Sequence, residues 1–88
     1  MIEEYEEKIL ELIDEMVETA SDDELFASGY LRGHISLAAA DCEQDGEEDI
    51  FSLKIRVAKS LKDNASELSP VDQSIVANLW QRLQDAIG

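Results

Sequence analysis

Apolar residues recur at steps of three and four along nearly the whole chain, and this is the period of an α-helix, not of a strand. In the first 20 residues the apolar positions are Ile2, Tyr5, Ile9, Leu12, Ile13, Met16, Val17 and Ala20. At about 100° per residue these side chains share one side of a helix, while acidic side chains occupy the other. The pattern predicts an amphipathic helix that ends near Ala20.

Capping patterns and an acidic turn divide the rest of the chain into three further helices. Ser21 and Glu24 have the spacing of a capping box, which marks the start of a helix. Residues 41–49 hold six acids and no base and predict a solvated turn. Ser69 before Pro70 marks the start of the last helix. The expected helices span about residues 2–20, 22–42, 47–65 and 70–87.

A chain of 88 residues is short enough to form a single domain with one hydrophobic core. Helices joined by connections this short pack most simply as antiparallel neighbours. The sequence therefore predicts an all-α fold, a four-helix up-down bundle that occupies residues 1–88 as one domain.

The expected helix over residues 22–42 has an unusual surface, because residues 25–40 contain a single charged side chain, Arg32. A helix that is apolar nearly all round is usually buried on several sides. Its remaining surface is a ladder of small residues with two larger residues at its border: Gly29, Gly33, Ser36 and Ala40, bordered by Leu25 and Arg32. Each mid-helix glycine costs about 1 kcal/mol relative to alanine, so we expect a close helix contact here, or a kink or break near Ser28 and Gly29. The ladder is then either packed inside the bundle or open as a groove for a partner helix or a second copy.

The charge of the chain is both large and uneven. With 21 acids and 7 bases the formal net charge is −14, which argues against direct contact with nucleic acid or anionic lipid. Residues 1–24 alone hold 11 acids and one base. The acids that share one face of the first helix are Glu3, Glu7, Glu11, Asp14, Glu15 and Glu18. Such a face attracts a basic protein, imitates a nucleic-acid backbone, or simply keeps a small protein in solution.

Three features favour the cytoplasm. The one cysteine, Cys42, cannot form an internal disulfide, which fits a reducing compartment. No run of 18 apolar residues is present to cross a membrane, and the acidic first residues differ from the basic start of a signal peptide. We therefore expect a cytoplasmic protein with no membrane partner.

No catalytic or metal site is predicted. His34 and Cys42 lie eight positions apart on one helix, about 12 Å along its axis, whereas a Cys–His dyad needs about 3 Å. One His and one Cys are too few for zinc. Residues 41–46 follow the opening of a calcium loop, but Ser52 stands where a closing glutamate belongs. We expect no catalytic residue, no cofactor and no bound metal.

Three ionisable residues fall on otherwise apolar helix faces: Glu6, His34 and Lys54. Counting back from each turn places positions 6 and 54 level with position 36, and position 80 level with position 54. Glu6, His34, Lys54 and Trp80 then form one polar layer, in which pairing relieves the cost of burying a charge. This layer is either a structural specificity layer or a small pocket with tuned protonation.

The stretch SDDELFASGYLRGH at residues 21–34, together with the Leu68-Ser69-Pro70-x-Asp72 entry to the last helix, resembles the YfcL family of small bacterial proteins. The acidic amphipathic first helix is also similar to the amino terminus of that family. The resemblance covers about half of the chain and implies a small helical bacterial protein. It brings no catalytic motif with it.

These observations favour a non-enzymatic, acidic helical module that binds another protein through a helix groove or through its acidic face. The alternative is an electrostatic mimic of nucleic acid that binds a basic protein. A third option is a small enzyme or ligand pocket around Glu6, His34 and Lys54. The expected partner is a protein, basic where it meets the acidic face, with a homodimer as a further alternative.

Overall fold

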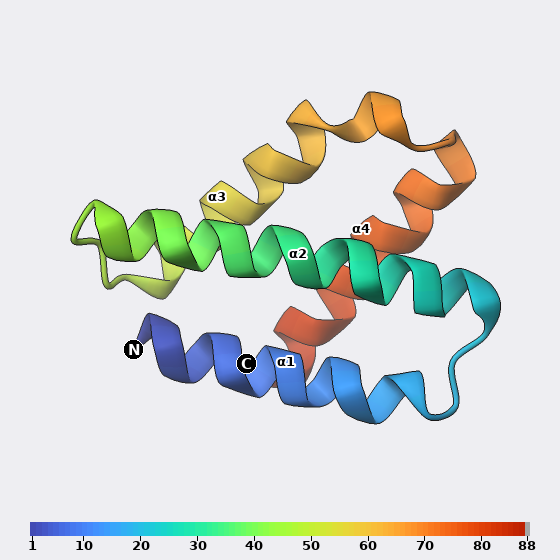
Figure 1. The fold of residues 1–88 in the computed structure, drawn as a ribbon, viewed down its shortest axis with the longest axis horizontal. Helices are drawn as coiled ribbons and strands as arrows, with labels where there is room; N and C mark the ends of the chain where they lie inside the picture. Colours follow the sequence, from blue (N-terminus) through green and yellow to red (C-terminus); the bar gives the residue numbers. More distant parts are fainter. Residues whose placement is uncertain (88) are drawn as a thin grey trace.

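The computed structural model describes residues 1–87, and its central element is α2 (Asp22–Gln44), which packs against each of the other three α-helices. The other helices are α1 (Ile2–Val17), α3 (Ile50–Asp63) and α4 (Pro70–Ile87), and a short 3-10 helix, η1 (Ala65–Glu67), precedes α4. In Figure 1, α1 runs antiparallel beside α2, and α4 crosses behind α2. The predicted all-α fold with four helices is confirmed. No helix within residues 1–87 is both long and apolar enough to cross a membrane.

The hydrophobic core lies between one face of α2 and the three neighbouring helices. The fully buried residues of this core include Leu31, Ile35 and Cys42 of α2, Ile9 and Ile13 of α1, Leu53 and Val57 of α3, and Leu83 of α4. The three- and four-residue steps in the sequence therefore become one buried stripe on each helix. Trp80, a member of the predicted polar layer, is only 7% exposed and belongs to this core.

The helix starts follow the predicted caps. The Ser21 hydroxyl accepts a hydrogen bond from the backbone N–H of Glu24 (3.3 Å), and the Glu24 carboxylate accepts one from the backbone N–H of Ser21 (3.4 Å). The capping box at the start of α2 is therefore confirmed. At the start of α4, the Ser69 hydroxyl accepts from the backbone N–H of Asp72 (3.2 Å).

Several helix boundaries differ from the prediction by two or three residues. α1 ends at Val17, three residues earlier than predicted. α2 runs two residues further than predicted, to Gln44. α3 begins at Ile50, three residues late, because the Asp49 carboxylate accepts from the backbone N–H of Phe51 (2.9 Å) and caps the helix there.

α2 is a continuous helix, so it does not break near Gly29 as one alternative predicted. The expectation that it is buried on several sides holds where it meets the other helices, but one face stays open to solvent. Phe26 and Leu37 are 46% and 58% exposed on that face. α2 therefore presents apolar side chains to the core and to solvent alike.

We expect the two sides of α2 to respond very differently to the same truncation. Leu31→Ala removes a fully buried side chain and should lower the free energy of unfolding by about 3 kcal/mol. Leu37→Ala removes a side chain that is 58% exposed and should change it by less than about 0.5 kcal/mol. Urea denaturation followed by circular dichroism measures both values, and equal losses would contradict this description of α2.

Candidate functional site

The face of α2 that points to solvent carries the ladder of small residues. Gly29, Gly33, Ser36 and Ala40 are all exposed. A Cβ atom added at either glycine would meet no heavy atom within 4 Å. The ladder is therefore not internal packing, since no helix within residues 1–87 uses the close approach that the glycines permit. We call this surface the open face of α2, and it consists of Leu25, Phe26, Gly29, Gly33, Ser36, Leu37 and Ala40.

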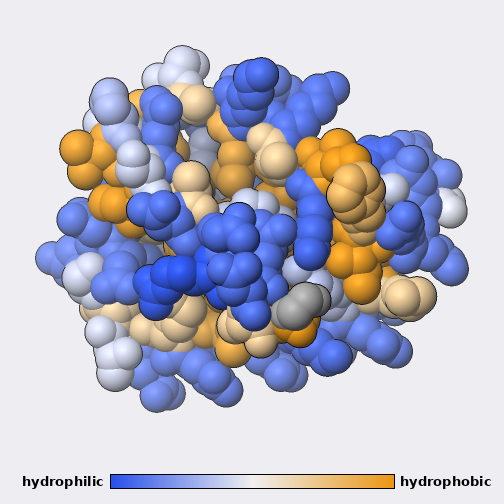
Figure 2. All heavy atoms as spheres, turned by 180° about the vertical axis from the view of Figure 1, so that it is seen from behind, coloured by the Kyte–Doolittle hydropathy of each residue, from blue (hydrophilic) through white to orange (hydrophobic). Residues whose placement is uncertain are grey.

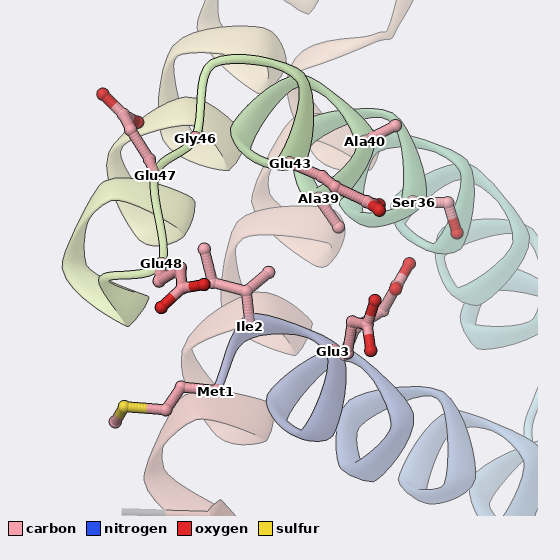
Figure 3. A pocket seen from close by; sticks show the side chains of 11 residues that line it. Met1, Ile2, Glu3, Ser36, Ala39, Ala40, Glu43, Gly46, Glu47 and Glu48 are labelled. Carbon is pink, nitrogen blue, oxygen red and sulfur yellow. The ribbon is translucent and has the colours of Figure 1, made fainter.

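One end of the open face continues into a groove between α1 and the last turns of α2. This acidic groove has a volume of about 440 Å³ and is lined by Met1, Ile2, Glu3, Glu6, Ser36, Ala39, Ala40, Glu43, Gly46, Glu47 and Glu48. Figure 3 shows Glu3 rising from α1 and Glu43 reaching from α2 toward the same space, below Ser36. The wall formed by α2 is small and uncharged at Ser36, Ala39 and Ala40, and it ends in the carboxylate of Glu43.

The arginines of α2 and α3 both form ion pairs. Arg32 pairs with Asp14 and so joins α2 to α1. Arg56 of α3 pairs with Asp45 and, at 3.2 Å, with Glu47, whose side chain points away from the groove in Figure 3. The other four glutamates of the acidic groove form no ion pair within residues 1–87. Their charge remains available to a cation from outside the chain.

Glu6 is a partly buried carboxyl group of the acidic groove. Burial raises the pKa of Glu6 above its ordinary value, and the Ser36 hydroxyl beside it opposes that rise. The neighbouring carboxylates of Glu3, Glu43 and Glu7 raise the pKa of Glu6 further. A positive group placed in the groove would reverse these effects, because it favours the ionised form of each carboxyl around it.

The ionisable residues of the predicted polar layer each have a different partner. Glu6 faces Ser36 in the acidic groove, and the Lys54 ammonium lies 5.7 Å from the centre of the Tyr5 ring. Counting residues from the turn correctly predicts which positions of α1 and α2 lie at the same level along the two helices, since Glu6 and Ser36 line the same groove. His34 and Ser36, however, lie about 160° apart around α2, so Glu6 and His34 lie on different sides of that helix. The structure therefore brings Glu6, His34 and Lys54 to no shared site.

His34 makes a contact that the sequence spacing does not reveal. Its Nδ1 atom lies 2.6 Å from Ser60 Oγ of α3, and its ring centre lies 4.5 Å from that of Tyr30. The Tyr30 hydroxyl in turn donates to the backbone carbonyl of Asn64 (3.5 Å). A serine beside a histidine is one part of a nucleophile–base arrangement, but neither residue lines the acidic groove. What this contact does in the fold is to tie α2 to α3.

Cys42 is fully buried in the core, and burial raises the pKa of its thiol, so the thiol stays protonated at neutral pH. Across the part of the chain that the structure describes, no three His, Cys, Asp or Glu side chains are placed to hold one metal ion. The carboxylates of the acidic groove line a space instead of converging on a point.

The predicted acidic face of α1 is exposed along its whole length. It comprises Glu3, Glu7, Glu11, Asp14, Glu15 and Glu18. Asp14 pairs with Arg32, and the other five carboxylates form no ion pair among the described residues. Because Glu3 also lines the acidic groove, the acidic face and the groove form one continuous anionic surface at the start of α1.

Comparison with known proteins identifies a family and a similar bacterial sequence. A family model described as YfcL protein matches residues 3–85. A curated protein of Escherichia coli (strain K12), called "Uncharacterized protein YfcL", is 51% identical over 85 residues, which cover 94% of this chain and 92% of that protein. No solved structure matches the chain.

Because the two glycines of the open face serve no contact within the fold, we expect alanine at either position to stabilise the protein. Gly29→Ala and Gly33→Ala should each raise the free energy of unfolding by about 1 kcal/mol. Gly46→Ala is the contrasting control and should lower it, because Gly46 has a φ of +73°, a backbone conformation that is strained for alanine. Urea denaturation measures all three, and a loss of stability at position 29 or 33 would show that the fold itself needs the glycine.

We expect Glu6→Gln to stabilise the protein at neutral pH. The folded-state pKa of Glu6 lies above its ordinary value of 4.5, so the folded protein binds this proton more tightly than the unfolded chain does. Stability of the wild type therefore falls as pH rises through 4.5 and then through the raised pKa. The advantage of the variant should be full near pH 7 and should fade as pH falls to about 4. Denaturation across this pH range tests it, with the exposed Glu18→Gln as control, and an advantage independent of pH would contradict the cause.

Proposed function

This chain belongs to the YfcL family, and we propose that it is a non-enzymatic protein interaction module whose open face of α2 receives a basic helix of a partner. One observation carries the proposal: Gly29 and Gly33 lie mid-helix on an exposed surface where nothing within 4 Å would meet an added Cβ. A glycine in such a place costs the fold about 1 kcal/mol relative to alanine and makes no contact that would offset the cost. The absence of a side chain is useful only to something that approaches from outside.

The open face has the shape that docking of a helix requires. Small residues at steps of four, three and four allow two helix backbones to come close together. Leu25, Phe26 and Leu37 stand exposed on the same face and add apolar area around the small residues. Helix-in-groove recognition uses anchors at three- and four-residue steps, which is the spacing of the gaps on this face.

The charges around the open face support a basic partner in preference to an acidic or neutral one. The acidic groove borders the face at Ser36 and Ala40, and four of its glutamates form no ion pair within the described residues. A partner helix with apolar residues on one side and lysine or arginine at the edge would fill the face and reach these carboxylates. Attraction of this kind sets orientation and speeds encounter more than it adds affinity.

The acidic face of α1 supports a second candidate function, mimicry of nucleic acid toward a basic protein. Five of its six carboxylates form no ion pair in the described part of the chain, and they extend over the whole helix. Binding through this face would depend almost entirely on charge, and salt would weaken it steeply. Binding to the open face of α2 would keep its apolar part at high salt.

We place this module in the cytoplasm. Cys42 is a free thiol, and unpaired cysteines are typical of reducing compartments. The compartment matters for the experiment, because the partner has to be sought among proteins that share it.

A photo-crosslinking residue in place of Leu37 tests the open face inside bacterial cells. We expect it to capture a protein with a basic helix, because position 37 lies on that face and is 58% exposed. The same residue at the exposed Ser74 of α4 should capture none. The captured protein is then purified for a direct measurement of binding.

Gly33→Gln decides whether that binding uses the open face, because it places a polar side chain where the structure has open space. It should weaken binding about tenfold or more at both about 0.15 M and about 0.5 M NaCl, while Ser74→Gln leaves binding unchanged. Unchanged binding by the Gly33→Gln variant would overturn the proposal. Mimicry of nucleic acid would be favoured by a different result, in which Gly33→Gln has no effect. Binding would then be lost in the Glu7→Gln/Glu11→Gln variant, and the wild type would lose it at the higher salt concentration.

A further inference from the structure

α3 presents an apolar surface that nothing in the described chain covers. Phe51 and Ile55 are 66% and 53% exposed and lie one helical turn apart, and the exposed Ala58 continues their stripe. The next positions on this side are Lys59 and Lys62, both exposed. We call these five residues the outer face of α3. Figure 2, which shows the molecule from behind, has apolar atoms gathered on the side where α3 lies.

The outer face of α3 has the opposite charge to the rest of the molecule. α3 carries three lysines and one arginine against one aspartate, in a chain with a net charge of −14. Arg56 is engaged by carboxylates of the preceding turn, whereas Lys59 and Lys62 form no ion pair within residues 1–87. An apolar stripe followed by unpaired lysines is the pattern of a basic amphipathic helix. This is the kind of helix that the open face of α2 is suited to receive.

We propose that the occupant of the open face of α2 is a second copy of this chain, which contributes the outer face of its α3. The inference rests on the proposed function of α2 and names the partner for it. The chain then carries both halves of one interface. One half is the open face of α2, which is uncharged and lies beside carboxylates, and the other is the outer face of α3, an apolar stripe beside lysines.

The spacing of the two faces matches when the helices run parallel. Phe51 is followed by outer-face residues four and seven positions later, and Gly33 is followed by open-face residues four and seven positions later. With Phe51 over Gly33, the largest side chain of one face meets the open space of the other. In the same register Ile55 lies level with Leu37, so the contact removes apolar area of both exposed side chains from water.

The lysines fall beside the carboxylates in this register. Phe51 and Lys62 are 11 residues apart, about 16 Å along a helix, and Gly33 and Glu43 are 10 residues apart, about 15 Å. Lys62 of one copy therefore reaches the acidic groove of the next, which Glu43 lines. The pairing places a cation where the structure leaves carboxylates without ion pairs.

Two copies that each carry a charge of −14 repel one another over long distances, and salt decides whether the local contacts prevail. The Debye length is about 8 Å at 0.15 M salt, so repulsion between distant parts of two molecules is then screened. Lysine–carboxylate pairs at contact distance are screened far less. We therefore expect self-association to strengthen as salt rises from a very low concentration to about 0.15 M. Binding between oppositely charged proteins would weaken over the same range.

The two faces lie on different sides of the molecule, which determines the kind of assembly. α2 runs in front of α4 in Figure 1, whereas the apolar area near α3 is seen from behind in Figure 2. A contact between two different surfaces is heterologous and extends to further copies unless a ring closes. The assembly is therefore a head-to-tail series and not a closed two-fold dimer.

Sedimentation of the wild-type protein and of two variants tests this contact. Phe51→Gln/Ile55→Gln removes the apolar stripe of α3 and leaves the open face of α2 intact, and Gly33→Gln does the reverse. The wild type at about 0.15 M NaCl should show a mass that rises with concentration beyond that of a dimer, up to about 1 mM. Each variant alone should remain a monomer. Mixed in equal amounts, the two should form a 1:1 dimer and nothing larger, because each supplies the face that the other lacks.

The substituted positions are all exposed, so we expect these variants to keep the fold, and circular dichroism is the check. Ser74→Gln, an exposed change on α4, should associate as the wild type does. The proposal is overturned if the wild type stays monomeric or if the mixed variants stay monomeric. It is also overturned if either variant alone associates as strongly as the wild type.

The failure of this inference can be told apart from the failure of the proposed function. A different protein captured at position 37 should bind the Phe51→Gln/Ile55→Gln variant as well as it binds the wild type. If self-association is absent while Gly33→Gln weakens binding of that protein, only the identity of the occupant is wrong. If Gly33→Gln changes neither measurement, the open face of α2 receives nothing and both proposals fall.

Discussion

The burial of one face of α2 against three other helices is the interaction on which the rest of the structure depends. A domain of 88 residues has little interior, because only about 60% of its unfolded surface can be removed from water. One helix that serves three neighbours gathers all four apolar stripes into a single core. Leu31, Ile35 and Cys42 are fully buried in that core, and α1, α3 and α4 each pack against α2. Loss of this face would leave the other helices without a common surface.

A helix enclosed by three neighbours still has one side left over, and that side is where this chain departs from an ordinary bundle. The exposed side of a helix usually carries charged side chains. In residues 25–40, however, the only charged side chain is that of Arg32, which pairs with Asp14 of α1. The acids lie beside this surface, on α1 and in the turn that follows α2. Covering an uncharged surface requires little desolvation, while the surrounding carboxylates attract and orient a basic partner. The surface that would contact a partner, the open face of α2, is thus separate from the carboxylates that would attract it.

The charged residues contribute more to this external surface than to the stability of the fold. Three arginines hold α2 or the turn after it to its neighbours: Arg32 with Asp14, Arg56 with Asp45 and Glu47, and Arg82 with Glu24 at 3.7 Å. Ion pairs at sites this exposed are worth less than about 1 kcal/mol each. Most of the 21 acids take part in none of them. Hydrophobic packing around α2 therefore determines the shape, and the acids act mainly on what approaches from outside.

The sequence by itself determines the helical period, the cap at Ser21 and the division into four helices, because these depend on residues a few positions apart. It also determines which residues of neighbouring helices lie at the same level along the helix axes, since counting from the turns places Glu6 level with Ser36. Only the tertiary structure decides how each helix is rotated about its axis. That rotation places His34 against Ser60 and away from Glu6, and it leaves the glycine ladder open to solvent. In a helix that is apolar nearly all round, no local pattern distinguishes core from solvent, so the competition of three neighbours for its surface makes the choice.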